Sequence, residues 1–217
     1  MSRYDVIFFD LDGTLTDPGL GITSSVAHAL RRAGITPPPL QELYPFIGPP
    51  LVDSFVKYYG MTHEEGRTAV DWFREYFRDR GIFENEVYPG IESMLARLRE
   101  AGKTLVLATS KPEEFALRIL DHFGLRQYFD CVTGASMDET LSRKDEVIAL
   151  ALTRCKPADL NRVIMVGDRL HDIEGAKKNG LAAIGVLYGY GSREELETAG
   201  ANEIAATVKE LEQLLLF

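Results

Sequence analysis

The sequence has little of what several classes of protein require. Its 217 residues include two cysteines, Cys131 and Cys155, too few for a disulfide framework or a cysteine zinc site. The four histidines show no metal-ligand spacing. No apolar run approaches the length of a membrane span, and the stretch MSRYDVIFFD reaches an aspartate before an apolar signal-peptide core could form. We therefore expect a cytoplasmic protein that does not insert into membranes.

Positive charge is scarce as well. The net charge is -9 at pH 7, so we expect no basic patch of the kind that binds a nucleic acid polymer. A small phosphorylated metabolite is compatible with this charge, because its site needs only one or two local cations. The sequence leaves the oligomeric state open.

Apolar segments alternate with amphipathic segments from Tyr88 onward. The patterns predict helices over 90–102, 113–124, 144–155, 172–180, 193–200 and 207–217, and strands over 104–109, 129–135, 162–168, 182–189 and 202–206. This alternation indicates an α/β fold with a mostly parallel sheet, and strands this apolar suit a sheet covered on both faces.

The segment between the first strand, 6–9, and Val87 breaks this pattern. It predicts helices over 22–34, 51–60 and 67–81, joined by turns, and no strand. We therefore expect residues 1–15 and 87–217 to form the core and residues 16–86 to form an inserted helical-bundle cap domain. Both ends of the insertion would then lie near the carboxyl end of the first strand, where ligands bind in such folds.

Two acids, Asp10 and Asp12, end the first apolar strand. Residues two apart in an extended segment point to the same side, so both can face one site. A capped turn at Asp12-Gly13 is the structural alternative, but it leaves Asp10 unexplained. In VGDRLHD, Asp168 ends another strand and Asp172 follows one helical turn later. Four carboxylates at the same sheet edge repel one another unless a cation lies among them, and oxygen ligands favour Mg²⁺ over zinc.

Further candidates lie at the end of a predicted strand and at the start of a predicted helix. Thr109 ends the strand in ATSKP and can donate its hydroxyl to a phosphate oxygen; the neighbouring Ser110 is alternatively the first residue of a capping box with Glu113. Lys144 follows Ser142, which has capping-box spacing to Asp145, so the lysine falls in a first helical turn. A cation there opposes the helix dipole, so Lys144 is either solvated or retained to bind an anion. Arg143 is the alternative candidate for binding that anion.

In this order DLDGT, ATSK, a helix-opening lysine and VGDRLHD resemble the haloacid dehalogenase superfamily of phosphohydrolases. FIGPPL, ATSKPEEFA and VGDRLHDIEGAKKNGLAAIGVLYGYGS resemble its phosphoglycolate phosphatase and 5′-nucleotidase-like branch. The resemblance covers essentially the whole chain. It implies a Rossmann-like, doubly wound parallel sheet with a helical cap, and hydrolysis of phosphoglycolate or nucleoside monophosphates.

The resemblance also implies a role for each candidate residue. Asp10 would be the nucleophile that forms an aspartyl-phosphate, and Asp12 would be the general acid and base. Thr109, Ser110 and Lys144 would bind phosphoryl oxygens. Mg²⁺ would be held by the Asp10 carboxylate, by the main-chain carbonyl of Asp12 and by Asp168, with Asp172 supporting it directly or through water.

Two other functions would use similar residues. A β-phosphoglucomutase-like sugar phosphomutase shares all four motifs and differs in the cap. A phosphoacceptor signalling domain also uses a strand-end aspartate, Mg²⁺, Thr and Lys, but it needs no helical insertion.

Overall fold

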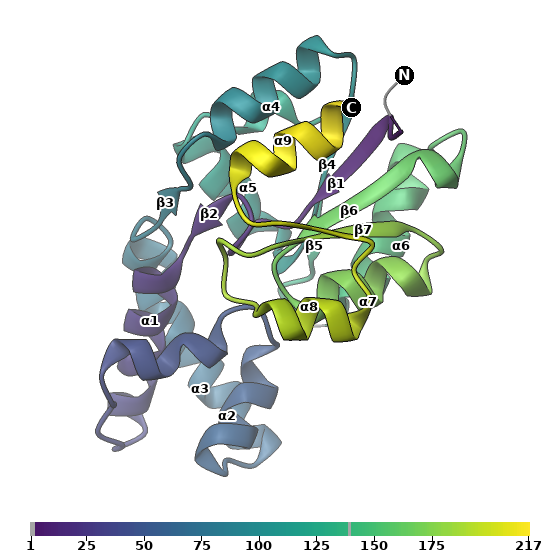
Figure 1. Cartoon of the computed structure of the whole chain (residues 1–217). Coiled ribbons are helices and arrows are strands. Elements are labelled where there is room, and N and C mark those ends of the chain that lie inside the picture. Colours follow the sequence, from purple (N-terminus) through teal and green to yellow (C-terminus); the bar gives the residue numbers. More distant parts are fainter. Residues whose placement is uncertain (1–2, 139) are drawn as a thin grey trace. The chain divides into compact units, whose positions relative to one another are not determined.

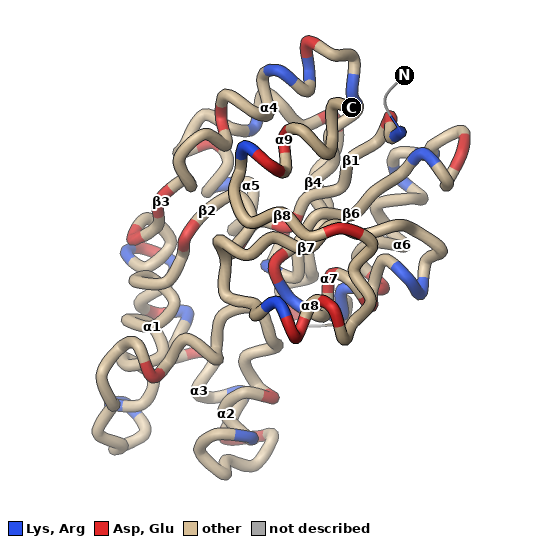
Figure 2. The backbone as a smooth tube through the Cα atoms, in the orientation of Figure 1, with Lys and Arg blue, Asp and Glu red and all other residues tan. Residues whose placement is uncertain are grey.

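The computed structural model of the chain describes residues 3–138 and 140–217. These residues form two compact units, one of residues 3–16, 87–138 and 140–217 and the other of residues 17–86. Figure 1 shows both units coloured along the chain. Figure 2 marks the positions of the acidic and basic residues along the backbone of both units.

The first unit is built on a six-stranded sheet of order β5-β4-β1-β6-β7-β8, in which every neighbouring pair is parallel. Its strands are β1 (Val6–Phe9), β4 (Thr104–Pro112), β5 (Cys131–Ala135), β6 (Val163–Gly167), β7 (Ala182–Val186) and β8 (Glu203–Ala205). This architecture confirms the predicted α/β fold with a doubly wound parallel sheet. The chain winds from β1 toward β5 and then from β6 toward β8, so the order reverses between β1 and β6. Ligands of open parallel sheets bind at such a reversal.

Helices cover both faces of this sheet (Figure 1). They are α4 (Ile91–Glu100), α5 (Glu113–His122), α6 (Lys144–Cys155), α7 (Leu170–Lys178), α8 (Arg193–Ala199) and α9 (Val208–Leu216), with short 3₁₀ turns η3 (Arg126–Tyr128) and η4 (Leu160–Arg162). On the face covered by α6 and α7, Phe8 and Met165 pack against Val147 and Ile173, all fully buried. Burying side chains of this size stabilises the fold by about 1.5–3 kcal/mol each.

The second unit is helical. It contains α1 (Gly19–Arg32), η1 (Leu40–Phe46), α2 (Leu51–Tyr59), α3 (His63–Tyr76) and the π-helical turn η2 (Phe77–Gly81). Its aromatic core includes Phe46, whose ring lies 5.0 Å from that of the fully buried Phe55. The chain passes between the units at β2 (Thr16–Asp17) and β3 (Glu86–Val87), which pair with each other.

Three helices begin earlier than the sequence predicts, and α7 is one of them, with its start at Leu170 rather than at 172. Helix α3 begins at His63 rather than at 67, because Thr62 and Glu65 form a reciprocal capping box. Helix α1 begins at Gly19 rather than at 22, although glycine is a poor helix former. Gly21 is required there because a Cβ atom would lie 1.9 Å from the carbonyl oxygen of Gly81.

The loop after β7 packs closely on the turn after β1. A Cβ atom at Gly189 would lie 2.2 Å from the carbonyl oxygen of Gly13 and 2.5 Å from Cβ of Asp168. The main-chain N–H of the next residue, Tyr190, donates to Asp168 Oδ2 at 2.8 Å. This loop therefore fixes the position of Asp168, the residue that directly follows β6.

We predict that Gly189→Ala lowers the free energy of unfolding by about 1–3 kcal/mol, because the added methyl group must displace backbone. The measurement is urea denaturation. Gly124→Ala is the comparison variant: nothing lies within 4 Å of its added Cβ, so its only cost is its positive φ of 67°. A Gly189→Ala protein no less stable than Gly124→Ala would contradict the close packing of this loop.

Candidate active site

Asp10 directly continues β1. Its main-chain N–H donates to the carbonyl oxygen of Val166 at 2.9 Å, so the ladder between β1 and β6 extends to this residue. The chain then turns sharply: Gly13 has a φ of 79°, and a Cβ atom on it would lie 2.1 Å from Asp168 Oδ2. Glycine is therefore needed at this position both for its conformation and for the close approach of Asp168.

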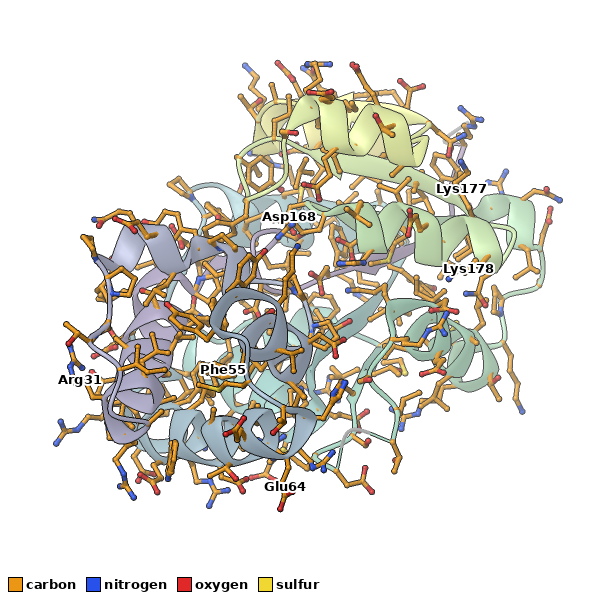
Figure 3. The ribbon with its side chains drawn as sticks, turned by 90° about the horizontal axis from the view of Figure 1, so that it is seen from below. Arg31, Phe55, Glu64, Asp168, Lys177 and Lys178 are labelled. Carbon is orange, nitrogen blue, oxygen red and sulfur yellow. The ribbon has the colours of Figure 1, made fainter. Side chains whose placement is uncertain are left out.

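Asp168 and Asp172 reach the same place from β6 and α7. Asp168 follows the strand directly, and Asp172 lies in the first turn of the helix, where its Oδ2 accepts from the Arg169 N–H at 3.1 Å. In Figure 3, Asp168 lies at the opposite end of the α7 region from Lys177 and Lys178. Carboxylate oxygens of Asp10, Asp168 and Asp172 all lie within 4.8 Å of one another.

Lys144 is the cation at the centre of this cluster. It is the first residue of α6, and its buried Nζ lies 2.6 Å from Asp10 Oδ1, 2.8 Å from Asp172 Oδ1 and 3.1 Å from the Ala108 carbonyl oxygen. The ammonium group donates hydrogen bonds to Asp10 Oδ1 and the Ala108 carbonyl oxygen, and it forms an ion pair with Asp172. Arg143, its rival in the sequence, instead pairs with Asp145 and is 60% exposed.

Burial and the charges of neighbouring groups shift the pKa values of the residues in this cluster. Burial, with the neighbouring Asp172 and Asp10 carboxylates, raises the pKa of Asp168 well above its usual range. Burial also raises the pKa of Asp172 to about 6, against the opposing effect of Lys144. Burial disfavours the charged form of Lys144, but the Asp10 and Asp172 carboxylates outweigh it and raise its pKa.

Thr109 and Ser110 lie within β4, which runs three residues beyond the predicted strand, to Pro112. Thr109 is buried, and its Oγ1 accepts from the Lys111 N–H at 3.2 Å. The capping box considered for Ser110 and Glu113 is wrong, because Pro112 is the residue that precedes α5. Ser142 does not cap α6 either; Arg143 precedes that helix, with no side-chain cap.

Lys111 is the site residue that the sequence reading missed. Its Nζ lies 2.9 Å from Asp12 Oδ2, and both side chains are almost covered. The signal was present: Lys111 follows Thr109 by two residues, the same spacing that relates Asp10 to Asp12. The predicted strand ends at Thr109, whereas β4 continues through Lys111 to Pro112.

The residues present fit a divalent cation. Asp168 Oδ1 is buried and has no hydrogen-bond partner among the described residues. Four carboxyl groups lie here, those of Asp10, Asp12, Asp168 and Asp172, and among the described residues three of them form ion pairs with the buried ammonium groups of Lys111 and Lys144. When all six are ionised, two negative charges remain, and oxygen-only donors of this kind suit Mg²⁺.

Comparison with known proteins agrees with this chemistry. Residues 7–186 match the haloacid dehalogenase-like hydrolase family. A 5′-nucleotidase of Pseudomonas aeruginosa is 44% identical, with 98% of this chain and 96% of that protein covered. Tyrosine-protein kinase PtkA of Mycobacterium tuberculosis is 39% identical (97% and 72% covered), and a phosphoglycolate phosphatase of Agrobacterium fabrum is 32% identical (84% and 80% covered).

The fold is also similar to that of solved structures. The crystal structure of a predicted phosphatase from Clostridium acetobutylicum superposes with a TM-score of 0.96 at 47% identity, covering 99% of each chain. In the described residues, no helix is both long and apolar enough to cross a bilayer. The resemblance predicted from the motifs is thus confirmed: the chain belongs to the haloacid dehalogenase-like hydrolase family and is a phosphoric monoester hydrolase.

Proposed function

We propose that the chain is a Mg²⁺-dependent phosphatase that hydrolyses small phosphate monoesters, either phosphoglycolate or nucleoside monophosphates, through an aspartyl-phosphate on Asp10. The observation that carries the proposal is the position of the Asp10 carboxylate. It lies at the reversal of the sheet, bound by Lys144 and next to Asp168 and Asp172. The relatives named 5′-nucleotidase and phosphoglycolate phosphatase support these two substrate classes.

The reaction would proceed in two steps. Asp10 attacks phosphorus while the bond to the leaving oxygen breaks, and Asp12 donates a proton to that oxygen. Asp12, now a carboxylate, then takes a proton from the water that attacks the aspartyl-phosphate, which releases inorganic phosphate and free Asp10. Thr109 and Ser110 would donate hydrogen bonds to phosphoryl oxygens.

Lys144 would act mainly through its charge. Because its three donors already have oxygens within reach, it orients Asp10 before substrate binds, and a phosphoryl oxygen would have to replace one of these partners. A carboxylate about 4 Å from a doubly charged phosphate is repelled by about 8 kcal/mol at an effective dielectric of about 20, so the site needs this cation.

Mg²⁺ would be held by Asp10, Asp168 and Asp172, with the main-chain carbonyl of Asp12. When bound, the metal would supply the positive charge that Lys144 alone lacks. The direct experiment is a panel of phosphorylated metabolites, assayed for phosphate release with Mg²⁺ and with EDTA. Transfer of phosphate between sugar hydroxyls without release would instead indicate a mutase, and one slow turnover per chain would indicate a phosphoacceptor domain.

Asp10→Asn is predicted to lower turnover at least about 10³-fold, because the amide cannot attack phosphorus. Phosphate release and thermal unfolding are both measured. Asp121→Asn, at an exposed position on α5, is the control and should behave as wild type. An Asp10→Asn protein with more than a tenth of wild-type activity would remove Asp10 from the nucleophile's role.

Saturating Mg²⁺ is predicted to stabilise the protein. At a concentration about 100 times its Kd the gain is about 2.7 kcal/mol, or roughly 5–11 °C in Tm for a chain of this length. Asp168→Asn should lose most of this shift, since it removes a ligand, whereas Asp121→Asn should keep it. Equal Tm values in Mg²⁺ and EDTA for the wild type would exclude the metal site.

A further inference from the structure

A second buried lysine, Lys111, lies near the end of β4 and has no role in the two steps above. Its side chain is 6% exposed, and its Nζ lies 2.9 Å from Oδ2 of Asp12, whose side chain is 12% exposed. A charge-assisted pair with so little solvent around it is screened much less than a surface ion pair.

The backbone that carries Lys111 is itself fixed. The Lys111 N–H donates to Thr109 Oγ1, and the pairing register with β5 shifts between Thr109 and Pro112. Gly134 of β5 packs directly against this irregular segment, since a Cβ atom there would lie 2.7 Å from the Lys111 carbonyl oxygen. The ammonium group thus extends toward Asp12 from a tightly held stretch of main chain.

The ion pair makes the two carboxyl oxygens of Asp12 different. Oδ2 is taken by Lys111, whereas Oδ1 is buried and has no hydrogen-bond partner in the described part of the chain. Lys144 meanwhile binds Asp10 and Asp172. The two buried lysines of the site therefore bind different carboxylates. Lys144 pairs with the proposed nucleophile Asp10, and Lys111 pairs with the proposed acid and base Asp12.

We propose that Lys111 is a positioning residue for Asp12: it anchors Oδ2 so that Oδ1 delivers the proton to the leaving oxygen and later takes one from water. The inference rests on the proposed function. In the first step the proton moves from Oδ1 to the leaving oxygen as its bond to phosphorus breaks. In the second it moves from water to Oδ1 as the water oxygen bonds to phosphorus and the bond to Asp10 breaks.

Dependence on the leaving group distinguishes positioning of an acid from a general structural effect. p-Nitrophenolate is a stable anion and needs little proton donation, whereas the alkoxide released from phosphoglycolate needs it. Both substrates share the second step, which requires Asp12 as the base. A misplaced Asp12 should therefore leave the rate of the first step nearly unchanged for p-nitrophenyl phosphate and slow it for phosphoglycolate. The second step should slow for both substrates.

The test is rapid-mixing kinetics of Lys111→Met with Mg²⁺. With p-nitrophenyl phosphate we expect a burst of p-nitrophenolate close to one per chain at a near wild-type rate, followed by turnover about 10²-fold slower. With phosphoglycolate we expect formation of the phosphoryl-enzyme itself to slow about 10²-fold. Lys111→Arg should restore most of the rate with both substrates.

Lys103→Met is the matched control. Lys103 is also buried, and it lies directly before β4, at the opposite end of the strand from Lys111. Its ammonium group donates to the Tyr4 carbonyl oxygen. Its loss should change neither burst. If Lys111→Met does not fold, Lys111→Gln takes its place. In an Asp12→Asn background, loss of Lys111 should cause no further slowing.

Equal slowing of both bursts, or additive losses with Asp12→Asn, would overturn the positioning role. Unchanged kinetics with both substrates would do the same. A wild-type protein that releases no phosphate from these two esters or from nucleoside monophosphates would instead refute the proposed function, so the two failures are distinguishable.

Discussion

The concentration of negative charge at the reversal between β1 and β6 is the constraint on which the rest of the site depends. Three buried aspartates and the nearly covered Asp12 meet there. Burying a charge without a partner is costly, so the fold places an ammonium group on each side, Lys144 from α6 and Lys111 from β4. In the function proposed above, the charge still in excess would attract a divalent cation, and the bound cation would in turn attract a phosphate.

Much of this arrangement could be predicted because it follows from local spacing. Alternating apolar and amphipathic segments indicated the parallel sheet, and such a sheet brings its carboxyl strand ends to one edge. Asp10 and Asp168 each follow a buried strand directly, so their approach needed no knowledge of distant contacts. A cation at the start of a helix is either solvated or retained to bind an anion, so the residues left Lys144 and Arg143 as candidates. The ion pair between Lys144 and Asp10 decides between them.

The features that could not be predicted depend on contacts between distant segments. Glycine at 21 looks like a helix breaker, but it is selected by the backbone of residue 81, and helix α1 begins before it. The extension of β4 to Pro112 depends on pairing with β5, and this extension brings Lys111 to Asp12. Gly189 looks like a simple turn residue, yet the approach of Asp168 requires it to lack a side chain.

The measurement that tests the central claim most directly is the mass of the enzyme quenched in acid during turnover with Mg²⁺. The account predicts one phosphoryl group per chain, located on Asp10 after proteolysis and removed by hydroxylamine, as expected of an acyl phosphate. A phosphoryl group on another residue, or rapid phosphate release without any covalent adduct, would contradict it.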